Sequence, residues 1–387
     1  MPRIKDRDIV MLSNIEWTML WQRQQIFASY FSRSSRRVVF VESQGKRNPR
    51  LSDLPRIADR LARFLTKRSR RALHDTESAP ANLTVITPLV LPSTLRIFRR
   101  INRTLFIPAL VKTIQKQGVT HPIVINYLPT QTSLDAMALL QPCLKVYDCV
   151  ENFPAYPAVP EDTAAIEEDI IKSSHLVLTD SEFLYLKAKK IREDVVRILP
   201  GVDYDHFQQA DTGPFKGDIQ SLCFYGGIND RRIDFDLLQR LADSGNFTIH
   251  MVGPVDSKIP SFPKNVVFHG PVPYPDLPLH LRDSDAFLFP YRITDFTRGI
   301  IPAKMFECFA TGKPVIATPL PSFQPYKDLI HIGDNSDHMV EIIRNIKALE
   351  SNASYDQRKE AARKSSWESR YHDVLTLIEE KLKKKAA

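Results

Sequence analysis

Short runs of apolar residues alternate with stretches of helical periodicity along almost the whole chain. Such runs predict buried strands, whereas apolar residues spaced three and four apart predict amphipathic helices. In the first half, the predicted strands are Asp8–Ser13, Val38–Val41, Leu83–Thr87, Ile123–Asn126, Leu144–Cys149, Leu176–Thr179 and Val195–Leu199. Helices are predicted between them at about Trp17–Phe31, Leu51–Arg70, Leu95–Gln117, Thr163–Ser173 and Glu182–Lys190.

The alternation starts again after Asp203. The second set of predicted strands is Leu222–Tyr225, Phe247–Val252, Val266–His269, Ala286–Phe289, Val315–Thr318 and Ile330–Ile332. Helices are predicted near Asp234–Asp243, Pro275–Arg282, Pro302–Thr311 and Asp337–Glu350. Repeated strand–helix units predict parallel sheets covered by helices on both faces, so the fold class is α/β, with two doubly wound domains. We expect these domains at residues 1–203 and 204–365, followed by an amphipathic helix at 366–387.

Composition places the chain among ordinary globular proteins. Of its 387 residues, 43% are hydrophobic and 25% are charged, and no run approaches the roughly 18 uncharged apolar residues that a membrane-spanning helix needs. The N-terminus lacks the apolar core of a signal peptide. The four cysteines form no CxxC pair. These features predict reduced thiols and a cytoplasmic location.

Charge is distributed unevenly. Residues 1–120 hold 23 Lys and Arg against 8 Asp and Glu, whereas the rest of the chain holds 30 against 37. Two stretches, at about 51–71 and 95–117, combine an apolar stripe with flanking arginines. Such helices lie in an anionic membrane surface, although core-facing helices with solvated arginines are the alternative. The arginines are not interleaved with stacking aromatics, so we expect no nucleic-acid partner.

The segment IPAKMFECFATGKPVI (301–316) carries the first candidate chemistry. Lys304 and Glu307 lie three residues apart, on one face of the predicted helix, close to its N-terminus. A helix N-terminus attracts phosphate, Lys304 adds a positive charge for a diphosphate, and Glu307 can accept hydrogen bonds from ribose hydroxyls. A surface ion pair between the two residues is the alternative.

The segment FYGGINDRRID (224–234) follows the first strand of the second domain. Gly226 and Gly227 allow the backbone to approach an anion, and Arg231 or Arg232 can reach the same diphosphate. A tight turn with solvated arginines is the alternative. Neither a dinucleotide-binding fingerprint nor a P-loop is present. The ten histidines show no paired ligand spacing, so no bound metal is expected.

At these residues the chain resembles a known family. PAKMFECFATGKPVIAT (302–318) resembles the P-x-K-x-x-E-x-x-A-x-G-K-P-V signature of GT-B glycosyltransferases of the family-4-like group. Segments 199–207, 266–292 and 367–375 are similar to further family segments, in the same order. Segments 15–31 and 146–153 look like a subgroup associated with teichuronic-acid and exopolysaccharide synthesis. The resemblance implies two Rossmann-like domains facing each other across a cleft, with the terminal helix packing back on the first.

The resemblance also implies roles for individual residues. Lys304 and Arg232 would hold the diphosphate, with Arg231 as the alternative, and Glu307 would bind the ribose. Gly270 to Val272 would present backbone to the base, and the N–H groups of Ile300 and Ile301 would face the phosphates. One departure concerns the sugar, because Gly299 stands where the family has the first glutamate of its E-x7-E pattern. Asp295 is a nearby substitute. Another is that Ser13 to Glu16 replace the family's glycine-rich loop.

Glu151 is the first candidate for the catalytic base. It follows the strand Leu144–Cys149, where an acid can take a proton from an acceptor hydroxyl. A loop-capping role for Glu151 is the alternative. Asp148 is a rival candidate, but its position before Cys149 is typical of a buried, hydrogen-bonded acid. Glu16 is a further acid at the same edge. The resemblance implies that an acid in this loop is the base if the reaction inverts the anomeric centre.

These observations together predict a glycosyltransferase. It would use a UDP- or GDP-linked sugar as substrate, need no cofactor, and extend a lipid-linked oligosaccharide on the inner face of the plasma membrane. A nucleotide-sugar 2-epimerase with the same fold is the alternative. The sugar, the nucleotide, the acceptor and the stereochemistry are not determined by the sequence.

Overall fold

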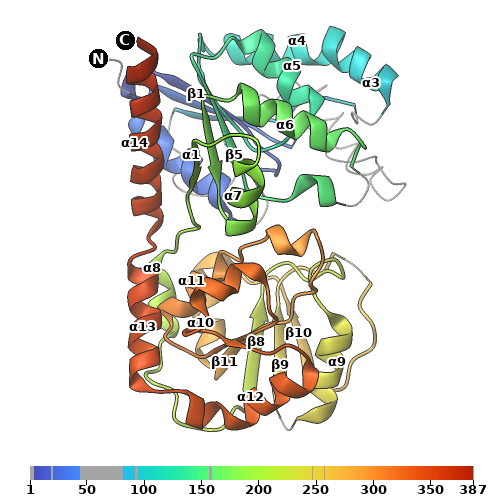
Figure 1. Cartoon of the computed structure of the whole chain (residues 1–387), viewed down its shortest axis with the longest axis vertical. Helices are drawn as coiled ribbons and strands as arrows, with labels where there is room; N and C mark the ends of the chain where they lie inside the picture. Colours follow the sequence, from blue (N-terminus) through green and yellow to red (C-terminus); the bar gives the residue numbers. More distant parts are fainter. Residues whose placement is uncertain are drawn as a thin grey trace. The chain divides into compact units, whose positions relative to one another are not determined.

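A computed structural model of the chain describes residues 4–18, 21–43, 82–91, 95–156, 159–245, 247–256 and 258–386. The chain forms two compact units (Figure 1). Unit 1 comprises Met1–Leu199 and Tyr371–Ala387, and unit 2 comprises Pro200–Arg370. Both ends of the chain therefore belong to unit 1.

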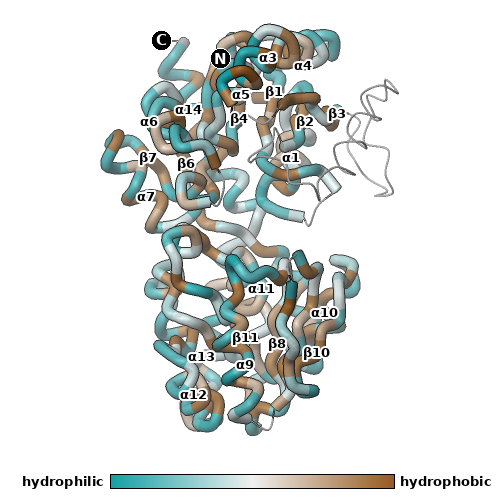
Figure 2. Tube along the Cα trace, turned by 90° about the vertical axis from the view of Figure 1, so that its right-hand side faces the viewer, coloured by the Kyte–Doolittle hydropathy of each residue, from teal (hydrophilic) through white to brown (hydrophobic). Residues whose placement is uncertain are grey.

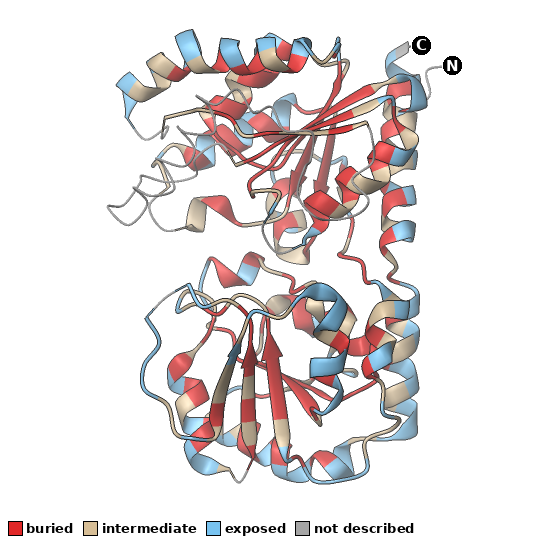
Figure 3. Cartoon of the chain, turned by 180° about the vertical axis from the view of Figure 1, so that it is seen from behind, coloured by how far each residue is buried: buried red, intermediate tan, exposed pale blue. Residues whose placement is uncertain are grey.

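Unit 1 is built on a sheet of seven strands, in the order β3-β2-β1-β4-β5-β6-β7. Every neighbouring pair is parallel, as the sequence predicted. The strands between the edge strands β3 and β7 are almost wholly buried (Figure 3), because helices cover both faces of the sheet. The strands are β1 (Asp8–Leu12), β2 (Arg37–Val41), β3 (Leu83–Ile86), β4 (Ile123–Asn126), β5 (Leu144–Cys149), β6 (Leu176–Thr179) and β7 (Val195–Arg197).

Two groups of helices cover this sheet. One face packs against α4 (Ile107–Gln115), α5 (Gln131–Leu140), α6 (Thr163–Ser173) and α7 (Glu182–Lys189), which share a single apolar core with the strands. The opposite face holds α1 (Arg23–Ser34), and α14 (Trp367–Ala386) lies beside it. Tyr371 of α14 stacks on Tyr30 of α1, with ring centroids 5.1 Å apart. The helix α3 (Arg96–Ile101) and a π-helical turn, η3 (Asn102–Phe106), lead into α4.

Unit 2 is built on a second parallel sheet, in the order β10-β9-β8-β11-β12-β13. Its strands are β8 (Ser221–Tyr225), β9 (Thr248–Val252), β10 (Val266–Gly270), β11 (Ala286–Phe289), β12 (Val315–Ala317) and β13 (His331–Ile332). Apolar strands alternate with helices of mixed hydropathy (Figure 2). The helices are α8 (Tyr204–Phe207), α9 (Phe235–Ser244), α10 (Leu277–Arg282), α11 (Lys304–Ala310), α12 (Ser336–Leu349) and α13 (Asn352–Arg363).

The helix predicted to begin at Trp17 in fact begins at Arg23. The Trp17 N–H donates instead to the Glu42 carboxylate at 2.9 Å, which holds the preceding residues in a loop. The helix predicted from Pro302 begins at Lys304, because the Pro302 carbonyl closes a short turn with Met305. The basic stretch at about 51–71 lies outside the described residues.

Helices α5 and α13 were not predicted. Their buried faces carry few large apolar side chains, so neither produces a clear helical stripe. In α13 the buried residues are Arg358 and Ala362. The Arg358 side chain is almost completely buried, forms an ion pair with Glu350, and donates to the Gly312 carbonyl at 3.0 Å. It thereby fixes the turn that follows α11.

Candidate active site

Backbone segments meet closely at the carboxyl end of strands β8, β9 and β10. The Gly226 N–H donates to the Val252 carbonyl at 2.8 Å, and the Gly253 N–H donates to the Gly270 carbonyl at 2.7 Å. A side chain at Gly253 would collide with the Gly226 carbonyl, and Gly226 itself has a φ of +115°. Both positions therefore need glycine. Ligands of open parallel sheets bind at this edge.

Tyr225, the last residue of β8, contacts both charged residues of α11. The Lys304 ammonium donates to the Tyr225 carbonyl and lies 4.2 Å from the centroid of the Phe224 ring. The Tyr225 hydroxyl donates to Glu307 Oε2 at 2.9 Å. Among the ion pairs of the described residues, Lys304 and Glu307 do not pair with each other. The surface ion-pair alternative is therefore wrong, and both charges face the edge of the sheet.

Burial shifts the titration of both charged groups. Desolvation lowers the pKa of Lys304 to about 8, although the Glu307 carboxylate opposes this shift. Desolvation also raises the pKa of Glu307 to about 7, against the hydrogen bond from Tyr225 and the charge of Lys304. A half-buried, partly desolvated cation is well suited to an anionic ligand.

The loop after β8 brings a second cation to this edge. Arg232 is half-buried, and its guanidinium lies 5.7 Å from the centroid of the Phe296 ring. Its positive charge contributes to the lowered pKa of Lys304, so the two cations lie near each other. Arg231, the alternative, is also half-buried in this loop. Gly227, in contrast to Gly226, has open space around its Cα.

The loop after β10 contains an aromatic residue that the sequence analysis missed. Tyr274 follows Gly270 and Val272 and stacks on His206, with ring centroids 4.3 Å apart and an angle of 19° between the planes. His206 is held by Asp203, whose carboxylate caps α8. The charge of Glu307 contributes to a raised pKa of Tyr274, after burial, which places the two residues near each other. His206 lies in the segment VDYDHF (202–207), which the sequence analysis used only to place the boundary between the two domains.

Of the two backbone N–H groups before α11 that were expected to face the phosphates, one is already hydrogen-bonded. The Ile300 N–H donates to the Thr297 carbonyl at 3.0 Å, so it is already engaged. In the described part of the chain, the Ile301 N–H has no backbone partner. Gly299 is buried, whereas the Asp295 side chain is 85% exposed and lies 3.7 Å from Arg298. Asp295 therefore points into solvent, which weakens its case as a substitute for a buried sugar-binding acid.

Unit 1 places its candidate acids at the carboxyl edge of the other sheet. Glu151 is half-buried and accepts a hydrogen bond from the Asn14 side chain at 3.4 Å. Asp148 is 1% exposed and accepts two hydrogen bonds from Arg23, at 2.9 and 3.2 Å. Because Asp148 is buried in this ion pair, it cannot reach an acceptor hydroxyl. It positions Arg23, as the sequence interpretation of a buried acid anticipated.

Arg23 also reaches the end of unit 1. Its Nη1 atom donates to the Ile198 carbonyl at 2.9 Å, immediately before the division between the two units. Asp180, which follows β6, lies near this pair, and burial raises its pKa well above the ordinary value. In the described part of the chain, Asp180 Oδ1 has no hydrogen-bond partner. The sequence analysis did not select Asp180.

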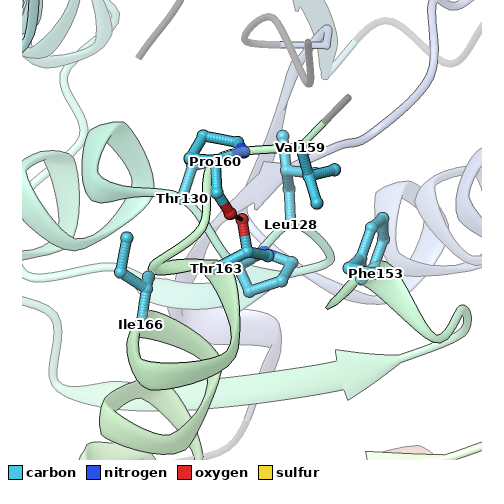
Figure 4. A pocket seen from close by; sticks show the side chains of 8 residues that line it. Leu128, Thr130, Phe153, Val159, Pro160, Thr163 and Ile166 are labelled. Carbon is cyan, nitrogen blue, oxygen red and sulfur yellow. Dashed lines mark hydrogen bonds between the residues drawn. The ribbon is translucent and has the colours of Figure 1, made fainter. Parts of the chain in front are cut away.

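A small apolar pocket lies in unit 1, beside the N-terminal part of α6 (Figure 4). Its lining includes Leu128, Phe153 and Ile166. The hydroxyl of Thr163 donates to the Pro160 carbonyl at 2.6 Å, and that of Thr130 is bonded to Ser133. The polar atoms of the lining are thus already paired, so the pocket offers nothing to orient a polar ligand.

No group of three or more His, Cys, Asp or Glu residues in the described ranges is arranged to hold a metal ion.

Comparison with solved structures defines the fold. Sucrose-phosphate synthase from Thermosynechococcus elongatus is similar over 97% of this chain and 98% of its own, with a TM-score of 0.67 and 14% identity. The Anabaena protein Alr3699/HepE, solved in complex with UDP and glucose, is similar over 97% of this chain and 100% of its own, with a TM-score of 0.65 and 10% identity. The fold is therefore GT-B, a two-domain α/β architecture.

Sequence comparison identifies the domain family. Residues 223–348 match the family described as "Glycosyl transferases group 1". The Bacillus subtilis (strain 168) protein named "Putative teichuronic acid biosynthesis glycosyltransferase TuaH" is 26% identical over 261 residues. That match covers 59% of this chain, and the chain matches 65% of the length of that relative.

Gly226 and Gly227 provide a matched pair for testing this geometry. We expect Gly226→Ala to destabilise the fold by about 1–3 kcal/mol, because a side chain there forces an unfavourable φ and displaces the Lys304 ammonium. Gly227→Ala has no such conflict and should stay within about 0.5 kcal/mol of the parent protein. Urea unfolding measures both. Equal effects of the two substitutions would contradict the described contact between Gly226 and Lys304.

Proposed function

We propose that this chain transfers a sugar from a nucleoside-diphosphate sugar to an acceptor hydroxyl. The observation that carries the proposal is the arrangement at Tyr225, which holds a half-buried cation and a half-buried carboxylate at one sheet edge. A nucleoside diphosphate has an anionic diphosphate for the cation and a ribose diol that donates hydrogen bonds to the carboxylate. The UDP and glucose in the HepE structure favour a UDP-linked donor for this chain.

Each donor contact would come from the carboxyl edge of the unit 2 sheet. The ammonium of Lys304 and the guanidinium of Arg232 would hold the diphosphate, where they stabilise the negative charge that develops as the glycosidic bond breaks. The carboxylate of Glu307 would accept from the ribose hydroxyls, and the Gly270–Val272 backbone would face the base. We propose no cofactor, because positive side chains can stabilise the leaving diphosphate without a metal ion.

In this proposal Glu151 takes the proton from the acceptor hydroxyl. It is half-buried at the carboxyl edge of the unit 1 sheet, whereas Asp148 is buried in its ion pair with Arg23. A carboxylate that keeps contact with solvent can exchange its proton after each turnover. Asn14 orients one carboxylate oxygen of Glu151. Glu16 is half-buried on the same segment as Asn14 and lies outside the proposed reaction.

Nucleotide binding should follow a bell-shaped dependence on pH. The cation form of Lys304 decreases above a pKa of about 8, and the anion form of Glu307 decreases below a pKa of about 7. We therefore expect UDP affinity to be highest between pH 7 and 8 and to weaken about tenfold at pH 6 and at pH 9. Isothermal titration calorimetry with UDP, GDP, ADP and dTDP measures the affinity and the base preference.

The Glu307→Gln variant distinguishes the ionisation of Glu307 from the ionisation of the nucleotide itself. The nucleotide's own terminal phosphate also ionises near pH 6, but that ionisation is common to both proteins. We expect the variant to bind UDP more weakly at pH 7.5 and to lose the additional decrease that Glu307 causes at low pH. If none of the four nucleotides binds, or if the variant follows the pH profile of the parent, the proposed donor site is wrong.

Glu151→Gln tests the catalytic base. Removing a general base slows the chemical step by about 10²- to 10⁴-fold, so kcat should fall while the affinity for UDP stays unchanged. Glu161→Gln, an exposed acid in the same unit, is the control and should keep full activity. Sugar transfer is measured as release of the nucleotide in the presence of acceptor. Conversion of the nucleotide sugar to an epimer without any acceptor would favour a 2-epimerase instead.

We further propose that α3, η3 and α4 bind an anionic membrane surface next to a lipid-linked oligosaccharide acceptor. Residues 95–117 contain six Lys and Arg and no Asp or Glu. The side chains of Leu95, Ile97 and Leu105 are 52%, 58% and 61% exposed. The predicted stripe is only partly exposed, since Phe98 and Ile101 are half-buried. No helix in the described ranges is long and apolar enough to cross a membrane.

Removing charge from this surface should weaken membrane binding. Each basic residue near an anionic surface contributes about 1 kcal/mol, so the triple substitution of Arg96, Arg100 and Arg103 to Ala should lower partitioning about 100-fold. Flotation with phosphatidylglycerol-containing vesicles measures this, and pure phosphatidylcholine vesicles should bind neither protein. The control replaces three exposed basic residues of unit 2: Arg240, Lys347 and Lys364. Similar losses in both triple variants would indicate a non-specific charge effect and contradict a defined surface.

A further inference from the structure

Two of the three tryptophans in the chain lie together at the carboxyl edge of the unit 1 sheet. Trp17 and Trp21 precede α1, and their ring centroids are 5.3 Å apart, with an angle of 77° between the planes. Trp17 also packs edge-on against Phe40 of β2, at 5.0 Å. Phe40 is fully buried, whereas Trp21 is 44% exposed. We call Trp17 and Trp21 the aromatic platform.

The backbone beneath the platform is firmly held. The Trp17 N–H donates to Glu42 Oε1, and the Gln25 amide donates to the Glu16 carbonyl at 3.4 Å. The Asn14 N–H donates to the Gln24 side chain at 3.2 Å. Glu42 is itself 5% exposed, so it cannot simply rotate into water. An exposed aromatic ring on a rigid support loses little entropy when it binds a ligand.

The polar groups beside the platform identify the chemistry of the ligand. Asn14, three residues before Trp17, donates to the carboxylate of Glu151, and Glu16 is half-buried on the same segment. The flat face of an indole ring suits the apolar C–H face of a pyranose ring, and a carboxylate such as Glu151 can accept from one of its hydroxyls. A hydrocarbon chain offers no hydroxyl to the Glu151 carboxylate. An acyclic polyol has no flat apolar face to cover the indole.

We propose that the aromatic platform is an acceptor subsite, on which the terminal pyranose ring of the acceptor stacks and presents one hydroxyl to Glu151. The inference rests on the proposed transfer reaction and makes it more specific, because it assigns the side chain that recognises the terminal ring of the acceptor. Within this proposal, Trp21 determines acceptor specificity and takes no part in the proton transfer. Trp17 positions Trp21 through its contact with Phe40.

The Trp21→Ala and Trp21→Phe variants test the platform. Saturation-transfer NMR with the methyl pyranosides of glucose, N-acetylglucosamine and glucuronic acid should show contact to ring C–H protons in the parent protein. We expect affinity for the bound pyranoside to fall about tenfold in Trp21→Ala and less than threefold in Trp21→Phe, which keeps an aromatic face. Sorbitol should not bind. Leu186→Ala, an exposed apolar residue on α7, should leave binding unchanged.

A kinetic readout separates acceptor binding from a structural role. In the transfer reaction, Trp21→Ala should raise the KM for the acceptor about tenfold, with kcat and the KM for the donor unchanged. The stabilisation of the protein by UDP should be the same in all variants, so the donor site is tested independently. The subsite proposal is overturned if no pyranoside binds the parent protein, if sorbitol binds equally well, or if Trp21→Ala reduces vesicle binding without affecting pyranoside binding.

Discussion

The organisation of unit 2 depends on the end of strand β8, where one residue contacts both charges of helix α11. The backbone carbonyl of Tyr225 accepts from Lys304, and its hydroxyl donates to Glu307. Burial raises the pKa of the Tyr225 phenol, which therefore remains a donor at any physiological pH. The next residue must be glycine, because a side chain would displace Lys304. A short stretch of backbone thus fixes the positions of a cation and an anion.

In unit 1, buried polar side chains, and not glycines, fix the loops at the carboxyl edge of the sheet. Arg23 bridges the end of β5 and the Ile198 carbonyl, and Glu42 holds the loop that follows β1. Breaking a buried ion pair by removing one partner costs several kcal/mol, so these contacts specify loop conformations strongly. Their common effect is to make the carboxyl edge of the sheet rigid. Glu151 and the aromatic platform both lie on this rigid edge.

The sequence predicted the sheets well, because buried parallel strands are continuous apolar runs that need no knowledge of distant residues. It predicted the shared face of Lys304 and Glu307 for the same local reason. It could not predict that Tyr225, 79 residues before Lys304, receives its ammonium. It also missed α13, whose buried face is made by Arg358, and it read Trp17 as helical although Glu42 holds that residue in a loop. Each of these three errors involves a polar contact between residues that are far apart in the sequence.

Gly299 shows how the two charges of α11 limit what else the donor site can hold. The Glu307 carboxylate is already costly to ionise, and the charge of Asp203 raises its pKa further. A second carboxylate close to Glu307, at the buried position 299, would add repulsion next to a ligand that is itself an anion. Glycine removes that repulsion, and the nearest acid in sequence, Asp295, is exposed and close to Arg298. In the proposed reaction, position 299 therefore supplies no acid to the donor sugar, and the general base is Glu151 of unit 1.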